Sequence, residues 1–271
     1  MSETLAPDRL SQRLREARQR KRAALIGYLV AGDPDLQTTE LVIAAVAQAG
    51  LDVLELGIPY GDPLADGPTI AAAGQRALAA GATLEATFGL VEKLQQLLPI
   101  VLFTYFNPVF HYGVERFAGR AAKAGAAGVI IPDITLEEIE EVRGALRARR
   151  LPVPLLVSPT TAPARAAQIA AATEGFLYVV SRLGVTGEGT GPDLTWLRAQ
   201  VEGLRLVTEK PLAVGFGIST PAQVADVAGW SDGVIVGSGL VSSYAGSSGA
   251  EAARLAGSYV KALVAALPQT P

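Results

Sequence analysis

Residues 51–68 read LDVLELGIPYGDPLADGP, and the architecture can be inferred outward from this stretch. Its first part is an almost continuous apolar run that ends in a carboxylate, Glu55, followed by Gly57. A run of this kind predicts a parallel strand covered on both faces, because a strand with one solvent-exposed face would alternate apolar and polar residues. An ionisable group at the end of a buried strand is costly to desolvate unless something uses it. We therefore expect a fold that gathers polar residues where its strands end.

Seven further runs of the same kind recur along the chain, separated by amphipathic segments such as residues 135–150 and 163–173. Eight strands, each followed by a helix, predict a (β/α)₈ TIM barrel of the α/β class. A doubly wound open sheet is the alternative. The regular spacing of the strands and the lack of a GxGxxG motif after the first of them favour the closed barrel. The basic amphipathic segment before the first strand predicts an extra N-terminal helix below the barrel, and residues 1–271 are expected to form a single domain. The predicted strands are 23–30, 51–57, 99–105, 127–133, 153–158, 175–181, 211–216 and 232–238.

Composition limits the classes of function. The chain has 271 residues, 49% of them hydrophobic, and a net charge of −3, which argues against nucleic acid as a partner. No apolar stretch of membrane-spanning length and no signal peptide stand out, so we expect a cytoplasmic protein without a membrane anchor. With no cysteine and a single histidine, His111, neither a thiolate nor a two-histidine metal site is expected. His111 is expected at the surface.

Catalytic groups of such barrels lie at the carboxyl ends of the strands. Glu55 occupies such an end, and Asp62 and Asp66 lie in the loop that follows. Glu55 is either a carboxylate paired with an arginine or a general acid–base whose pKa is raised by apolar neighbours. Taken alone, the two aspartates are more typical of turns than of catalysis.

Glycine-rich turns follow the last three predicted strands: GVTGEGTG (184–191), GFGIS (215–219) and VGSG (236–239). Glycine lets the backbone approach a ligand closely, and this end of the barrel commonly holds phosphate. No lysine falls at a predicted strand end, which disfavours a Schiff-base aldolase. The remaining chemistry is acid–base cleavage or isomerisation of a phosphorylated substrate with an apolar body.

These segments resemble one known family over nearly the whole chain, the tryptophan synthase alpha subunit. The match is carried in order by Gly32–Pro34, ELGIPYGDPLADGP, TYFNPVF, GVIIPD, SRLGVTG, AVGFGIST and DGVIVGS. The resemblance implies a carbon–carbon lyase of tryptophan biosynthesis that splits indole-3-glycerol phosphate into indole and glyceraldehyde 3-phosphate. It also implies a beta-subunit partner that carries pyridoxal phosphate, in a heterotetramer of two alpha and two beta subunits. No cofactor or metal is expected in this chain.

The resemblance also assigns roles to residues. Glu55 and Asp66 match the catalytic pair: Glu55 transfers protons to indole C3 and from the glycerol hydroxyl, and Asp66 stabilises positive charge at the indole N–H. The partner's contact surface is implied at the loop after residue 57 and at Asn107–Pro108. The remaining matches are Tyr178 and Thr186 as supporting residues, Tyr28, Tyr105 and Phe216 as walls around the indole, and Gly187, Gly217, Gly237 and Ser238 as the phosphate cradle.

The chain departs from the family pattern at Gly61, Thr135, Gly239 and Trp230-Ser231, none of which is in the proposed catalytic pair. Gly61 is expected to loosen the loop that presents Asp66. Two alternatives remain open: a stand-alone lyase that releases free indole, and a non-catalytic regulatory subunit. The presence of both Glu55 and Asp66 argues against the regulatory subunit.

Overall fold

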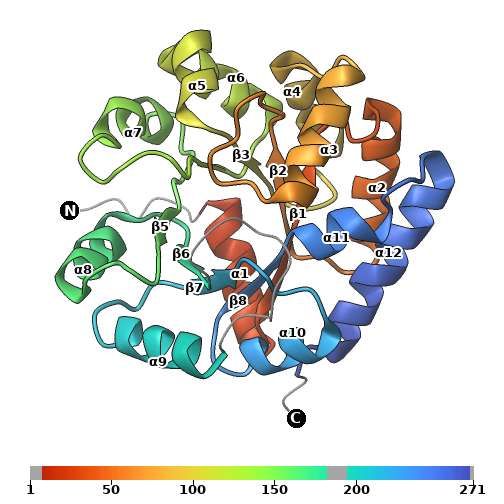
Figure 1. Cartoon of the computed structure of the whole chain (residues 1–271). Helices are drawn as coiled ribbons and strands as arrows, with labels where there is room; N and C mark the ends of the chain where they lie inside the picture. Colours follow the sequence, from red (N-terminus) through yellow and green to blue (C-terminus); the bar gives the residue numbers. More distant parts are fainter. Residues whose placement is uncertain (1–7, 182–193, 269–271) are drawn as a thin grey trace.

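The computed structural model describes residues 8–181 and 194–268, in which eight parallel strands form one sheet surrounded by helices (Figure 1). The sheet order is β4-β3-β2-β1-β8-β7-β6-β5, as in a barrel wound from consecutive strand–helix units. The predicted (β/α)₈ barrel is confirmed. The strands are β1 (Ala24–Val30), β2 (Val53–Gly57), β3 (Ile100–Phe103), β4 (Gly128–Ile130), β5 (Leu155–Val157), β6 (Leu177–Val180), β7 (Leu212–Gly215) and β8 (Gly233–Val236).

The helices bury apolar faces against the outside of the strands, which explains why the strands are apolar on both faces. Within the described ranges no helix combines the length and apolarity needed to span a bilayer. The helices are α1 (Arg9–Gln19), α2 (Leu36–Gln48), α3 (Pro68–Ala79), α4 (Leu84–Leu94), α5 (Phe106–Tyr112), α6 (Val114–Ala124), α7 (Glu140–Arg147), α8 (Pro163–Ala172), α9 (Leu194–Arg205), α10 (Pro221–Ala228), α11 (Ser238–Ser243) and α12 (Gly249–Ala266).

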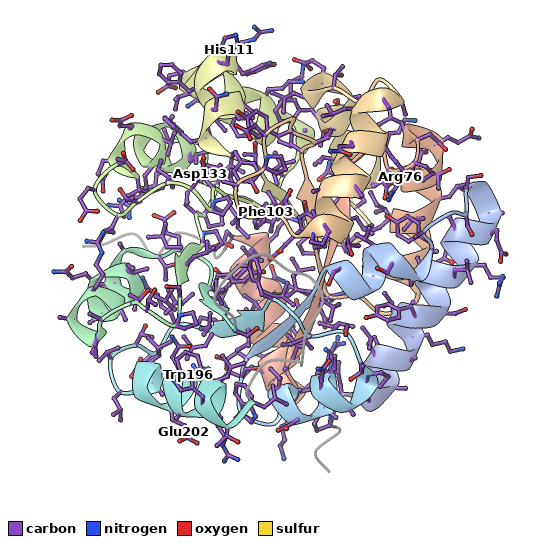
Figure 2. The ribbon with its side chains drawn as sticks, viewed as in Figure 1. Arg76, Phe103, His111, Asp133, Trp196 and Glu202 are labelled. Carbon is purple, nitrogen blue, oxygen red and sulfur yellow. The ribbon has the colours of Figure 1, made fainter. Side chains whose placement is uncertain are left out.

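Two elements begin later than predicted, at points where polar side chains form other hydrogen bonds. The strand predicted from residue 51 begins at Val53, since the buried Asp52 instead accepts hydrogen bonds from the Arg22 guanidinium (2.8 Å) and the Leu25 N–H (2.9 Å). The helix predicted from residue 135 begins at Glu140, and the Thr135 hydroxyl donates to Glu138 (2.7 Å) in the turn before it. His111 is exposed at the outer end of α5, as expected (Figure 2).

The predicted N-terminal helix is confirmed as α1, which lies across the centre of the ring in Figure 1. Its apolar residues Leu10 and Leu14 are fully buried among inward-facing barrel residues such as Val101 and Phe176. A Cβ atom on Gly175 would lie 2.8 Å from Leu10 Cδ2, so glycine is needed for this approach. The helix closes the end of the barrel at which the strands begin.

The seam between β4 and β5 is the least regular part of the barrel wall. The Val129 N–H donates to the Pro152 carbonyl across it (3.0 Å). A Cβ atom on Gly128 would lie 2.9 Å from the same carbonyl oxygen, so the two chain segments meet closely. Leu10 also touches this point, since its Cδ2 would lie 3.5 Å from a Cβ on Gly128.

Candidate active site

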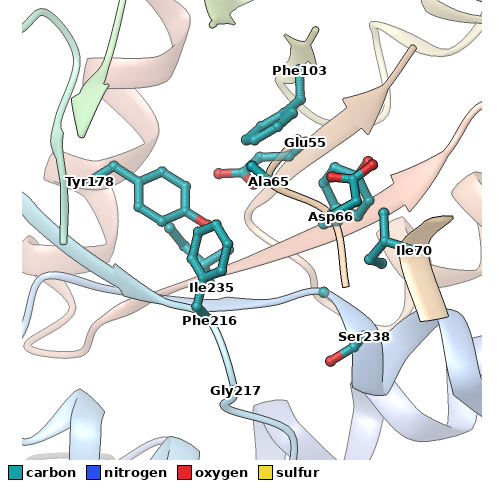
Figure 3. Close-up of a pocket in the computed structure, with 12 residues that line it drawn as sticks. Glu55, Ala65, Asp66, Ile70, Phe103, Tyr178, Phe216, Gly217, Ile235 and Ser238 are labelled. Carbon is teal, nitrogen blue, oxygen red and sulfur yellow. The ribbon is translucent and has the colours of Figure 1, made fainter. Parts of the chain in front are cut away.

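A pocket enclosing about 460 Å³ of empty space, part of it open to solvent, lies at the carboxyl ends of the strands. Strands β1, β2, β3, β6 and β8 contribute inward-facing side chains, and the loops after β2, β7 and β8 complete the wall. Figure 3 shows the side chains converging on this space. The lining residues are Tyr28, Glu55, Ala65, Asp66, Ile70, Phe103, Tyr178, Phe216, Gly217, Ile235, Gly237 and Ser238.

Glu55 lies at the floor of the pocket and is only 1% exposed. Within residues 8–181 and 194–268, neither of its carboxyl oxygens has a hydrogen-bond partner. This burial raises the pKa of Glu55 to about 8, because the charged form cannot be solvated there. No arginine of the described chain pairs with it, so of the two alternatives left by the sequence the structure favours an acid–base group. At neutral pH the side chain is mostly protonated and able to donate a proton.

Asp66 lies in the loop between β2 and α3 and is held by a tyrosine. The Tyr105 hydroxyl donates to Asp66 Oδ1 (3.0 Å) and itself accepts from the Ala65 N–H (3.0 Å). Partial burial raises the pKa of Asp66, while the hydrogen bond from Tyr105 opposes that rise. Tyr105, expected as a wall of the indole site, thus contacts Asp66 and is not among the residues lining the pocket.

Aromatic rings form the apolar walls. Tyr28 on β1 is the register partner of Glu55 on β2, and its ring meets Phe103 edge-on with centroids 5.4 Å apart. On the other side, the rings of Tyr178 and Phe216 lie 5.7 Å apart (Figure 3). Burial raises the pKa of both pocket tyrosines well above the usual range, so they are neutral phenols. The flat rings leave a space suited to an aromatic ligand.

Gly217 and Ser238 lie at the end of the pocket opposite Glu55 (Figure 3). Gly217 has a φ of +86°, and the preceding Phe216 has a φ of +72°, which is rare for a bulky residue. The Ser181 hydroxyl donates to the Phe216 carbonyl and holds this turn. Strained backbone of this kind is found where structure is fixed for function. Gly237 immediately precedes α11, so backbone N–H groups are available to an anion.

The departure at Gly239 has a steric explanation. A Cβ atom there would lie 2.3 Å from the Tyr259 hydroxyl, which donates to the Ser219 carbonyl (2.6 Å) just after the Gly217 turn. At Gly61 no atom lies within 4 Å of the position that a Cβ atom would take, so packing does not require glycine there. Thr186 and Gly187, expected as a supporting residue and part of the phosphate cradle, lie outside the described residues.

Sequence reasoning did not single out Ala65, Ile70, Phe103 and Ile235, which also line the pocket. Phe103 is the register partner of Gly57, two residues after Glu55, so counting inward positions along the strands could have found it. Ile70 stands in the first turn of α3, and no sequence signal marks it as different from a core residue. No cluster of metal ligands occurs in the described part of the chain.

Comparisons with known proteins point to one family. The family model described as "Tryptophan synthase alpha chain" matches residues 14–265. A tryptophan synthase alpha chain of Prochlorococcus marinus is 46% identical over 97% of this chain and 98% of its own length. One from Methanosarcina mazei is 48% identical over 86% of this chain and 85% of its own. A solved structure of Mycobacterium tuberculosis tryptophan synthase superposes with a TM-score of 0.90 at 35% identity, covering 98% of this chain and 100% of that one.

Proposed function

This chain belongs to the tryptophan synthase alpha chain family, and we propose that it cleaves indole-3-glycerol phosphate in the pocket between Glu55 and Gly217. The observation that carries the proposal is the buried, unpartnered carboxyl group of Glu55 in one pocket with a second carboxyl group, Asp66, and aromatic walls. This arrangement suits a carbon–carbon lyase that moves protons on an aromatic ring. The products are indole and glyceraldehyde 3-phosphate.

The proposed reaction divides into two proton transfers. Protonated Glu55 first gives its proton to indole C3, and the positive charge that develops on the indole N–H is stabilised by the carboxylate of Asp66. The Glu55 carboxylate then removes the proton of the glycerol hydroxyl next to the ring. The carbon–oxygen bond becomes a carbonyl, the bond to indole C3 breaks, and its electron pair restores the aromatic ring. Glu55 finishes protonated, as it began.

The remaining pocket residues are proposed to bind the substrate. The turn at Gly217 and the start of α11 at Gly237 and Ser238 would hold the phosphate through backbone N–H groups. Tyr28, Tyr178 and Phe216 would enclose the indole. Thr186 is proposed to contact Asp66, and Gly187 to bind the phosphate. The family resemblance supports both roles.

We further propose that the chain acts as one domain in the cytoplasm with a beta subunit that carries pyridoxal phosphate, as two alpha and two beta subunits. Exposed apolar side chains support a docking surface beside the site: Leu64 is 72% exposed next to Ala65, and Phe110 is 65% exposed on α5. The Asn107 amide of α5 donates to the Tyr60 hydroxyl of the loop that contains Leu64 (2.8 Å). A partner on this surface would touch the loop that carries Asp66.

The test is indole release from indole-3-glycerol phosphate, measured with and without a beta subunit. We expect a basal rate that the partner raises. A full rate without the partner would favour the stand-alone lyase, and activation of the partner without any cleavage would favour the regulatory subunit.

A further inference from the structure

Tyr28 carries a hydroxyl group into the pocket that also contains Glu55 and Asp66. Its ring lines the pocket beside Phe103, and the family resemblance implies only a wall at this position. A Cβ atom on Gly57 would lie 2.1 Å from the Tyr28 hydroxyl oxygen and 2.7 Å from Cζ. The hydroxyl therefore lies over the last residue of β2, one inward position beyond Glu55 toward the pocket mouth. Any larger residue at position 57 would displace it.

The ring is fixed from two sides. It packs against the barrel interior at Phe103 and against the cluster that contains Ile70 and Ala73 of α3, the helix that follows Asp66. Tyr28 thus connects β1 to the segment that positions Asp66. Tyr28 and Asp66 line the same pocket, Tyr28 from β1 and Asp66 from the loop after β2, whereas Tyr105, which binds Asp66, follows β3.

The surroundings of the hydroxyl favour a hydrogen-bond donor. Burial raises the pKa of Tyr28 well above its usual range, and the carboxyl group of Asp66 raises it further, ahead of Tyr105 and Glu55. The phenol therefore keeps its proton throughout the physiological pH range. The titratable groups whose charges raise the pKa of Tyr28 are Asp66, Tyr105, Glu55 and Tyr244. Of the hydrogen bonds found around Asp66 in the described part of the chain, one joins Tyr105 to Oδ1 and none involves Tyr28.

We propose that Tyr28 is a positioning residue for Asp66: with substrate bound, its hydroxyl donates to the Asp66 oxygen that Tyr105 does not hold. The inference rests on the proposed function, in which Asp66 must be an oriented carboxylate. Two phenols, one on β1 and one just after β3, would both hold the group and leave a lone pair for the indole N–H. The added donor stabilises the charged form as the pocket loses water.

The experiment compares Tyr28→Phe with Tyr112→Phe, a matched control whose hydroxyl binds Glu85 on the outer surface. The direct readout is the carbon-13 signal of the Asp66 carboxyl group, assigned with Asp66→Asn and titrated with and without indole-3-propanol phosphate. This analogue lacks the glycerol hydroxyls and cannot be cleaved. In its presence we expect Tyr28→Phe, unlike the control, to raise the pKa of Asp66. Loss of one hydrogen bond should also lower kcat about three- to tenfold with a smaller change in KM.

An Asp66 titration that is identical in the wild type and Tyr28→Phe with the analogue bound would overturn the proposal. A fall in kcat accompanied by loss of thermal stability and no titration change would likewise assign Tyr28 a packing role only. A wild-type chain without lyase activity would refute the proposed function instead, and the Asp66 titration would still decide the role of Tyr28.

Discussion

The Tyr105 hydroxyl binds Asp66 as a donor and the neighbouring Ala65 N–H as an acceptor, both at 3.0 Å. Because a phenol has one proton, donation to Asp66 requires an oxygen that accepts, which favours the ionised carboxylate. The same hydroxyl fixes the backbone and the side chain of one loop. The exposed Tyr60–Asn107 hydrogen bond lies next to it, with the rings of Tyr60 and Tyr105 centred 5.6 Å apart.

Tyr105→Phe should lower kcat by about tenfold, since both a charge-assisted hydrogen bond and the loop anchor are lost. The pKa of Asp66 should rise because only the effect of burial remains. The acid limb of the kcat/KM profile should therefore move to higher pH. An unchanged profile would show that the hydrogen bond does not govern Asp66, and Tyr112→Phe again serves as the remote control.

Glu55→Gln should nearly abolish indole release while the fold survives, because the replacement has the same shape and cannot transfer a proton. General acid–base groups contribute about 10²–10⁴ in rate, so more than about a tenth of the activity remaining would exclude this role for Glu55. Steady-state turnover of the purified variant is the measurement, with circular dichroism to confirm the fold.

The buried Glu55 should also make stability depend on pH. Its pKa rises from 4.5 in the unfolded chain to about 8 in the fold, so the folded state binds the extra proton between these values. Stability should then fall as pH increases through this window, by up to about 1.4 kcal/mol per pH unit, and level off above it. Measured by urea unfolding, the free energy of unfolding of Glu55→Gln should increase relative to that of the wild type between about pH 5 and about pH 8. The control Glu92→Gln, at an exposed position, should show no such increase. The same pH dependence of unfolding free energy in all three proteins would contradict the effect of burial.

Gly217→Asp should weaken phosphate binding by roughly a hundredfold, through charge repulsion and loss of close backbone approach. The positive φ of Gly217 strains any side chain there, so Gly217→Asn is the matched control with the same shape and no charge. The Asp variant should bind indole-3-propanol phosphate more weakly than the Asn variant by titration calorimetry. Equal binding by the two variants would place the phosphate elsewhere.

The buried Asp33 depends on Arg76 of α3, which donates to its two oxygens at 2.7 and 3.0 Å. Arg76→Gln removes the charge that compensates a carboxylate only 1% exposed. Because Arg76 is itself partly exposed, we expect a loss of about 2 kcal/mol in unfolding free energy, below the range for fully buried pairs. Arg254→Gln, in an exposed pair with Glu251, should leave the unfolding free energy nearly unchanged. Similar losses of unfolding free energy in Arg76→Gln and Arg254→Gln would mean that the burial of Asp33 does not affect the contribution of its ion pair to stability.

The eight strands could be predicted because each is a short apolar run, and such a run between two amphipathic segments is typical of a buried parallel strand. Glu55 could be predicted as a pocket residue because a carboxylate ending a buried strand is unusual. The role of Tyr105 could not, since its hydroxyl meets Asp66 across 39 residues of chain and that contact depends on loop geometry. Ile70 and Ile235 look like any core residue in the sequence, and only their place beside the pocket distinguishes them.

Leu10 packs against Gly128 and Gly175, which lie far from it in the sequence. This contact limits when α1 can dock during synthesis on the ribosome. Helix α1 precedes the strands in the chain, but its binding place includes Gly175 and Phe176, and the cluster it joins extends to Ile235. The chain must therefore be made at least through residue 176 before α1 can dock, although nascent chains tend to fold from the N-terminus. Until then its apolar face, with Leu10 and Leu14, has no native place to bind and is available to a chaperone. Helix α1 is thus made before the strands but docks only after most of them.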